Sequence, residues 1–126
     1  VYAITDPQDI TSPDVVKVAR SSDGIALYFS RSPIPYVRDT EPSGWLSQTP
    51  FWGHAGVYAF RREVLMEYPR LPESWLETAE KLEQLRLLEA GKRILTVEID
   101  YHPRGVDVPA DLELVKEILA SSSRPT

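Results

Sequence analysis

The sequence predicts one α/β domain in which helices flank a mixed β-sheet. Two observations support this prediction: β-branched and aromatic runs are separated by turn formers, and longer segments rich in Leu, Glu and Lys carry apolar residues at helical spacing. A length of 126 residues suits a single domain. With 42% hydrophobic and 26% charged residues, the composition is that of a globular protein rather than of a disordered or fibrous chain.

The first sixty residues are predicted to contain a β-hairpin and a long loop. Residues 15–20 and 25–29 have strand composition, and the Asp-Gly pair between them supplies the positive φ angles of a tight turn. Residues 36–52 show neither a helical nor a strand period, so we expect a surface loop there. A sheet edge and apolar surface left open tend to associate, so we expect the chain to form dimers.

The second part, residues 61–126, is predicted to contribute helices and one strand. Just before it, a strand over 54–60 would place His54 and Tyr58 on the same face. The strongest helical segment is 73–89, on whose wheel Trp75 shares a side with Leu82 and Leu85. The other expected elements are a short helix, a strand and a closing helix, over 61–67, 93–101 and 109–120.

Charge and cysteine content exclude several classes of function. The chain has 14 basic and 19 acidic residues, so we expect neither nucleic acid nor an acidic membrane as a partner. It has no cysteine, which excludes disulfide bonds, thiolate zinc sites and a cysteine nucleophile. No apolar run approaches the roughly 18 residues of a membrane span. We therefore expect a cytoplasmic protein, and the start at Val1 rather than Met indicates a fragment of a longer chain.

Three candidate ligand-binding side chains lie in the first half of the chain. Arg31 follows the hairpin in a proline-stiffened loop, where its guanidinium could bind a carboxylate or phosphate or simply pair with a local acid. His54 and Tyr58 offer directional hydrogen-bonding groups suited to ligand hydroxyls, although a structural histidine is equally consistent with the pattern. The sequence alone leaves both alternatives open.

Further candidates lie in the second half. Glu80, Glu83 and Gln84 have i, i+3, i+4 spacing and would converge on one patch of a helix, either a solvated face or a pocket edge. Asp107 precedes a proline-started helix, where a carboxylate caps the helix or binds a hard cation. The common phosphate-loop, zinc-protease and serine-elbow motifs are absent.

Four motifs follow one another along nearly the whole chain: SRSPIP, WGHAGVYAFRRE, LETAEKLEQLRLLEAGKRILTVE and GVDVPADLELV. In this order they resemble the C-terminal half of bacterial 3-deoxy-manno-octulosonate cytidylyltransferases, also called CMP-Kdo synthetases. The resemblance implies a partial nucleotidyltransferase-type three-layer fold, with a β-hairpin dimerisation region in residues 1–60 and helices and a strand that close the active site in residues 61–126. It also implies cytoplasmic homodimers that transfer CMP from CTP to the sugar acid Kdo, release pyrophosphate and supply lipopolysaccharide biosynthesis.

The resemblance also implies roles for single residues. Asp107 would be the catalytic ligand of Mg²⁺, which neutralises phosphate charge, and Arg31 would bind the Kdo carboxylate. The sugar hydroxyls would be held by four side chains: His54, Tyr58, Glu83 and Gln84. Glu80 is a weaker substrate-binding candidate. Val108 stands where the family more often has Thr, which removes a helix cap and leaves Asp107 in place.

One departure from the family pattern limits what the chain is expected to do alone. The basic, glycine-containing nucleotide loop and a further metal-binding aspartate have no counterpart here, so we expect negligible activity from the isolated chain. Two other interpretations remain. The first is a cytidylyltransferase for another sugar acid, such as a sialic acid. The second is a non-catalytic interaction module that uses the Glu83 patch and the loop at 36–52.

Overall fold

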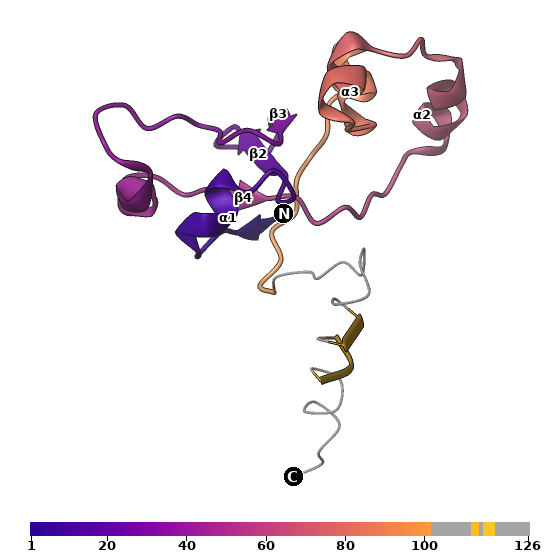
Figure 1. Ribbon diagram of the computed structural model, residues 1–126. Coiled ribbons are helices and arrows are strands. Elements are labelled where there is room, and N and C mark those ends of the chain that lie inside the picture. The colour runs from indigo at the N-terminus through magenta and orange to yellow at the C-terminus, as the bar shows by residue number, and fades with distance from the viewer. Residues whose placement is uncertain (102–111, 114, 118–126) are drawn as a thin grey trace.

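The computed structural model describes residues 1–101, 112–113 and 115–117. Its centre is a four-stranded sheet in the order β1-β4-β2-β3, formed by Tyr2–Ala3, Trp52–Gly53, Lys17–Arg20 and Ala26–Ser30 (Figure 1). Every pair is antiparallel. The prediction of a mixed sheet is wrong for the described residues, because the hairpin turn reverses β3 against β2 and no crossover connection produces a parallel pair.

The predicted hairpin is confirmed. Strands β2 and β3 pair with Val18 opposite Phe29. Gly24 in the turn has a φ of 82°, and its amide donates to the Ser21 carbonyl at 3.0 Å. A side chain at this position would be strained, which is why the Asp-Gly sequence forms the turn.

The segment predicted as a strand at 93–101 lies along the hairpin turn but pairs only locally. Leu95 forms an isolated antiparallel bridge with Ile25, and the Thr96 amide donates to the Gly24 carbonyl at 2.8 Å. The chain is therefore anchored beside the hairpin without extending the sheet by a full strand.

The stretch at 36–52 is more ordered than a surface loop. It contains the 3₁₀ helix η1 (Pro42–Ser47), and its Trp45 and Phe51 side chains are 3% and 1% exposed and stack at 5.8 Å. The five-residue helix α1 (Pro7–Thr11), which the sequence analysis did not predict, begins at an N-cap aspartate. Together these segments build the first of two hydrophobic cores: Tyr2, Ile4, Ile10, Trp45 and Phe51.

The second core joins the hairpin to the helices. It consists of Val18, Ala26, Phe29, Leu82 and Leu85. Figure 1 shows α2 and α3 on the far side of the hairpin from α1. None of the helices described here is long and apolar enough to cross a bilayer.

The single helix predicted at 73–89 is wrong, because the chain forms two short helices there. Helix α3 (Trp75–Glu80) ends at Lys81, which is left-handed with a φ of 56°, and α4 (Gln84–Glu89) follows. The break delivers Leu82 to the second core, where it is 6% exposed. Trp75, expected on the buried side, is 72% exposed.

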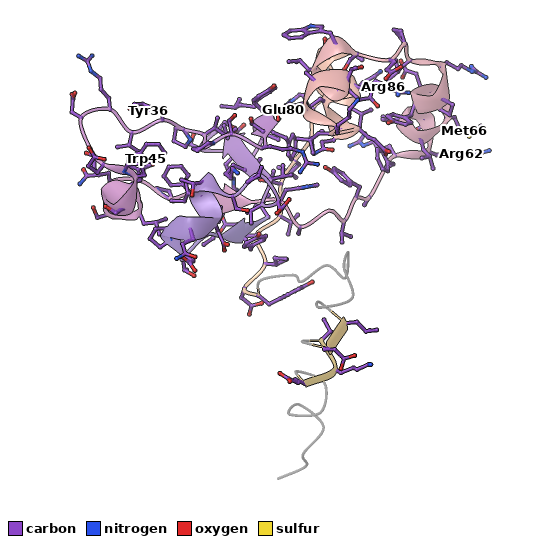
Figure 2. The ribbon with its side chains drawn as sticks, in the orientation of Figure 1. Tyr36, Trp45, Arg62, Met66, Glu80 and Arg86 are labelled. Carbon is purple, nitrogen blue, oxygen red and sulfur yellow. The ribbon has the colours of Figure 1, made fainter. Side chains whose placement is uncertain are left out.

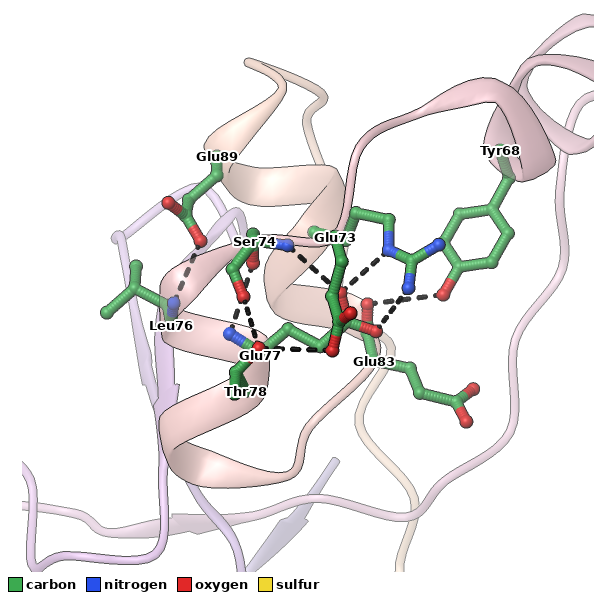
Figure 3. Close-up of polar contacts among 9 residues, drawn as sticks. Tyr68, Glu73, Ser74, Leu76, Glu77, Thr78, Glu83 and Glu89 are labelled. Atoms are coloured by element: carbon green, nitrogen blue, oxygen red, sulfur yellow. Dashed lines mark hydrogen bonds and ion pairs between the residues drawn. The ribbon is translucent and has the colours of Figure 1, made fainter.

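A clasp of polar contacts closes α3 against α4 (Figure 3). Ser74 and Glu77 form a capping box at the start of α3. Arg86 donates from Nε and Nη2 to the two Glu77 carboxylate oxygens, both at 2.7 Å. The Arg86 guanidinium also lies 5.0 Å from the Tyr68 ring centre. This bidentate pair, with its aromatic neighbour, fixes the angle between the helices.

Three other predictions have separate outcomes. The short helix is confirmed as α2 (Arg62–Glu67), followed by the 3₁₀ helix η2 (Tyr68–Arg70). The strand expected at 54–60 is irregular, because Gly56 turns the chain with a φ of 70°. In the closing helix expected at 109–120, the described residues are helical, and the rest lies outside the described part of the chain.

Candidate functional site

Arg31 and Glu80 meet where β3 ends against the C-terminus of α3, and Figure 2 shows Glu80 between the hairpin and the helices. The Arg31 amide donates to Glu80 Oε2 at 2.9 Å, and Arg31 Nε donates to the Glu80 main-chain carbonyl at 2.8 Å. The Ser30 hydroxyl donates to Glu80 Oε1 at 2.6 Å. Burial raises the pKa of Glu80, but these hydrogen bonds outweigh it and hold the pKa below its ordinary value.

Lys17 lies on the other side of Arg31 and is fully buried. Its ammonium donates to the carbonyls of Ser12, Val15 and Arg31, at 2.6, 2.5 and 2.5 Å. These bonds use its three protons, so the charge is solvated by the backbone. Burial lowers the pKa of Lys17, and attraction to Glu80 opposes that shift.

His54 and Tyr58 do come together, although no strand places them. The turn at Gly56 folds the segment back, and the Tyr58 hydroxyl lies 2.7 Å from His54 Nε2. The His54 ring also packs edge-on against Phe29, with 5.3 Å between ring centres. This contact connects the pair to the strand that ends at Arg31.

The electrostatics of this pair favour neutral groups. Burial lowers the pKa of His54 to about 4 and raises the pKa of Tyr58 well above its ordinary value. If the Tyr58 hydroxyl donates to Nε2 of the neutral ring, the ring proton is on Nδ1; in the other tautomer Nε2–H donates to the Tyr58 oxygen and Nδ1 is an acceptor. A hydroxyl, which both donates and accepts, is a suitable ligand for Nδ1 in either tautomer.

Glu80, Glu83 and Gln84 do not form the helical patch that their spacing predicts. The left-handed Lys81 separates Glu80 from the other two, so the three side chains do not share one helix. Glu83 is exposed. Gln84 is only 8% exposed, and its Nε2 has no hydrogen-bond partner within the described part of the chain. A buried side-chain N–H without a partner can donate a hydrogen bond to a bound ligand.

The comparisons with known proteins agree with one another. A family model described as cytidylyltransferase matches residues 1–94. The chain belongs to the cytidylyltransferase family. Curated relatives include the 3-deoxy-manno-octulosonate cytidylyltransferases of Chlorobium luteolum and Solibacter usitatus, 51% and 46% identical, each over 94% of this chain and 45% of the relative. A solved CMP:2-keto-3-deoxy-manno-octonic acid synthetase, complexed with CTP, is 45% identical with a TM-score of 0.86, over 96% of this chain and 47% of that chain.

The chain thus spans about half the length of the curated relatives it matches. The likeness to the solved synthetase confirms the predicted α/β fold class. The assignment to the C-terminal half stays a prediction, because the matched share of each relative could lie in either half of it.

Asp107, the predicted metal ligand of this cytidylyltransferase chain, lies outside the described residues. Within the described ranges, no three His, Cys, Asp or Glu side chains gather where they could hold a metal ion. The residues described here therefore do not by themselves fit a magnesium site. Asp107 would supply one oxygen ligand, and Mg²⁺ in proteins is commonly held by one or two carboxylates together with substrate phosphates.

Two residues of the Arg31 site escaped the sequence analysis. Ser30 and Lys17 contribute direct contacts to Glu80 and to the Arg31 backbone. Lys17 carried a signal, since it interrupts the β-branched run Val15, Val16, Val18. A charged residue in such a run faces either solvent or a buried set of acceptors. Ser30 carried no comparable signal.

Proposed function

We propose that this chain is part of an enzyme that transfers CMP from CTP to Kdo and releases pyrophosphate. The observation that carries the proposal is the joint likeness in sequence and fold, over 96% of the chain, to a CMP-Kdo synthetase complexed with CTP. We favour Kdo over another sugar acid because the curated relatives are named for Kdo. A non-catalytic module has no such support.

The proposed contribution of this chain is to bind and orient the sugar acid. Arg31 would bind the carboxylate through Nη2, since Nε and Nη1 already donate to the carbonyls of Glu80 and Pro13. His54, through Nδ1, and the unpaired Gln84 amide would form hydrogen bonds with sugar hydroxyls. Fixing the sugar in place lowers the entropic cost of bringing the C2 hydroxyl to the α-phosphorus of CTP.

The remaining assignments extend the proposal by resemblance. Tyr58 would act through His54, which it holds in orientation. Exposed Glu83 would contact the far end of the sugar. Mg²⁺ would accompany CTP and neutralise phosphate charge, with Asp107 as the ligand from this chain. We also propose a homodimer that serves lipopolysaccharide biosynthesis, and exposed Leu27 and Val97, at 61% and 70%, are consistent with covered surface in an assembly.

The test uses the protein encoded by the complete reading frame that contains these residues. Incubated with CTP, Mg²⁺ and Kdo, it is expected to release pyrophosphate and form CMP-Kdo, detected by mass spectrometry. N-acetylneuraminate in place of Kdo is the matched control and is expected to give little product. If no pyrophosphate appears with Kdo, or if the sialic acid is preferred, the proposal is wrong.

A second measurement concerns the binding residues. His54→Ala and Gln84→Ala are each expected to raise the KM for Kdo by about tenfold, a typical cost of losing one hydrogen bond to a ligand. The KM for CTP is expected to stay within twofold. Equal changes in both constants would contradict a sugar-binding role for these side chains.

A further inference from the structure

Arg31 is held on two sides by Lys17 and Glu80. The Lys17 ammonium donates to the Arg31 carbonyl from β2, the Glu80 carboxylate accepts from the Arg31 amide, and the Glu80 main-chain carbonyl at the end of α3 accepts from Arg31 Nε. Arg31 Nη1 donates to the Pro13 carbonyl at 2.9 Å, on the same segment that Lys17 binds through Ser12. The backbone and most of the guanidinium of Arg31 are therefore fixed by the protein itself.

Lys17 cannot serve as a ligand for a substrate. Its side chain is 0% exposed, and each of its three ammonium protons has a carbonyl acceptor. Burying an ammonium raises the free energy of the folded state unless hydrogen bonds replace its water. Here three carbonyls replace the water, and their bonds to Lys17 attach residues 12–15 and Arg31 to one another.

Glu80 also makes several hydrogen bonds within the protein. Oε1 accepts from the Ser30 hydroxyl and, at 3.4 Å, from the Tyr28 hydroxyl, and Oε2 accepts from the Arg31 amide. Its main-chain oxygen accepts a hydrogen bond from Arg31 Nε. These contacts tie the Glu80 carboxylate to the hairpin and to the Arg31 backbone, while Oε2, which accepts one bond, keeps a lone pair that a sugar hydroxyl could use.

We propose that Lys17 and Glu80 are positioning residues that fix the direction in which Arg31 presents Nη2 to the carboxylate of the sugar acid. This inference rests on the proposed function. Within the described part of the chain, Nη2 is the one guanidinium nitrogen that no bond uses. A pre-oriented guanidinium loses less rotamer freedom when the anion binds, so the positioning bonds raise affinity without touching the ligand.

The decisive variant is Glu80→Gln in the full-length protein, with Glu77→Gln as its matched control. Glutamine keeps one oxygen but turns the other acceptor into a donor, which faces the Ser30 hydroxyl or the Arg31 amide. Glu77 lies three residues earlier on the same helix and is paired with Arg86 instead. Glu77→Gln removes the negative charge of the ion pair with Arg86, whereas only Glu80→Gln disturbs the contacts to Ser30 and Arg31.

The expected result is a split between the two substrates. Glu80→Gln raises the KM for Kdo about tenfold, while kcat and the KM for CTP change less than about twofold. Glu77→Gln leaves the KM for Kdo within twofold. Equal effects of the two variants on the KM for Kdo, or no effect of Glu80→Gln, would overturn the inference. If Glu80→Gln does not fold, Ser30→Ala replaces it, with a threefold rise expected and an unchanged KM overturning the inference.

A readout without turnover separates this inference from the proposed function. In ¹H–¹⁵N spectra of the full-length protein, the Arg31 Nε–H signal is expected to exchange slowly with water, since it donates to the Glu80 carbonyl. Lys17→Met and Glu80→Gln are expected to accelerate that exchange about tenfold or more, and Glu77→Gln is not. A wild-type protein that makes no CMP-Kdo but shows this pattern refutes the function alone. Unchanged exchange in both variants refutes the positioning role.

Discussion

Glu77 and Glu80 lie three residues apart on α3 yet stabilise different parts of the molecule. Glu77 closes a local clasp with Arg86, nine positions away. Glu80 binds Ser30 and Arg31, fifty and forty-nine positions away, and joins the helices to the hairpin. The same residue type on one helix therefore stabilises a local helix pair at one turn and holds the candidate site against the hairpin at the next.

The two carboxylates respond to acid in the same direction. Hydrogen bonds from Arg86 lower the pKa of Glu77, and the donors around Glu80 overcome burial to lower its pKa. A carboxyl whose pKa is depressed by folding stabilises the fold above its ordinary pKa of 4.5. That contribution is lost as pH falls through the lowered value.

The largest expected effect comes from removing either carboxylate. Glu80→Ala is expected to lower the free energy of unfolding by about 3 kcal/mol, because it leaves the buried Ser30 hydroxyl and the Arg31 amide without an acceptor. Glu77→Ala is expected to cost about 2 kcal/mol, since the side chain of Arg86 is 21% exposed and stays partly solvated. Urea unfolding at pH 7 measures both, with exposed Glu63→Ala as a control near zero. A larger loss in Glu77→Ala would reverse the comparison.

A smaller effect is expected at His54 and depends on pH. Its folded pKa of about 4 lies below the ordinary 6.5, so between these values the unfolded chain binds a proton that the folded one does not. Stability is therefore complete above pH 6.5 and falls as the pH drops toward 4, by about 1–2 kcal/mol after allowance for solvent screening.

His54→Asn is the variant that tests this pH dependence. Urea unfolding at pH 7.5 and at pH 5 is expected to show a smaller difference for His54→Asn than for the wild type. Tyr58→Phe, which keeps the ring but removes the hydroxyl, is expected to retain most of that difference. An identical pH dependence in the wild type and in His54→Asn would show that the imidazole is not held neutral.

The smallest effect is expected at Trp75. Its side chain is 72% exposed, so Trp75→Ala is expected to change the free energy of unfolding by less than about 0.5 kcal/mol. A continuous helix at 73–89 would have buried this ring and made the same change cost about 3 kcal/mol or more. Urea unfolding separates the two cases, with Leu85→Ala as the positive control because Leu85 is fully buried.

Local patterns predicted the elements whose cause is local. The Asp-Gly turn gave the hairpin, and the helix at 62–67 followed from composition. The break at Lys81 left no such trace, because lysine favours helices and the left-handed conformation accompanies a long-range contact, the burial of Leu82 in the second core. The strand at 54–60 failed because one glycine with a positive φ overrode strand composition.

The sequence named candidate residues, whose roles stay predictions, but it did not predict how the structure arranges them. Family motifs named Arg31, His54 and Tyr58, and the structure pairs the last two through a turn rather than along a strand. The bond between Glu80 and the end of β3 depends on a contact across about fifty residues, which spacing rules do not reach. Asp107 stays a prediction, since it lies outside the described residues.

The left-handed conformation of Lys81 influences the distance between two parts of the candidate site. Glu80 ends α3 and Gln84 begins α4, so the carboxylate bound to the hairpin and the buried amide belong to two short helices joined by three residues, of which only Lys81 is left-handed. A substitution at Lys81 would therefore change the distance between these two groups without altering either of them.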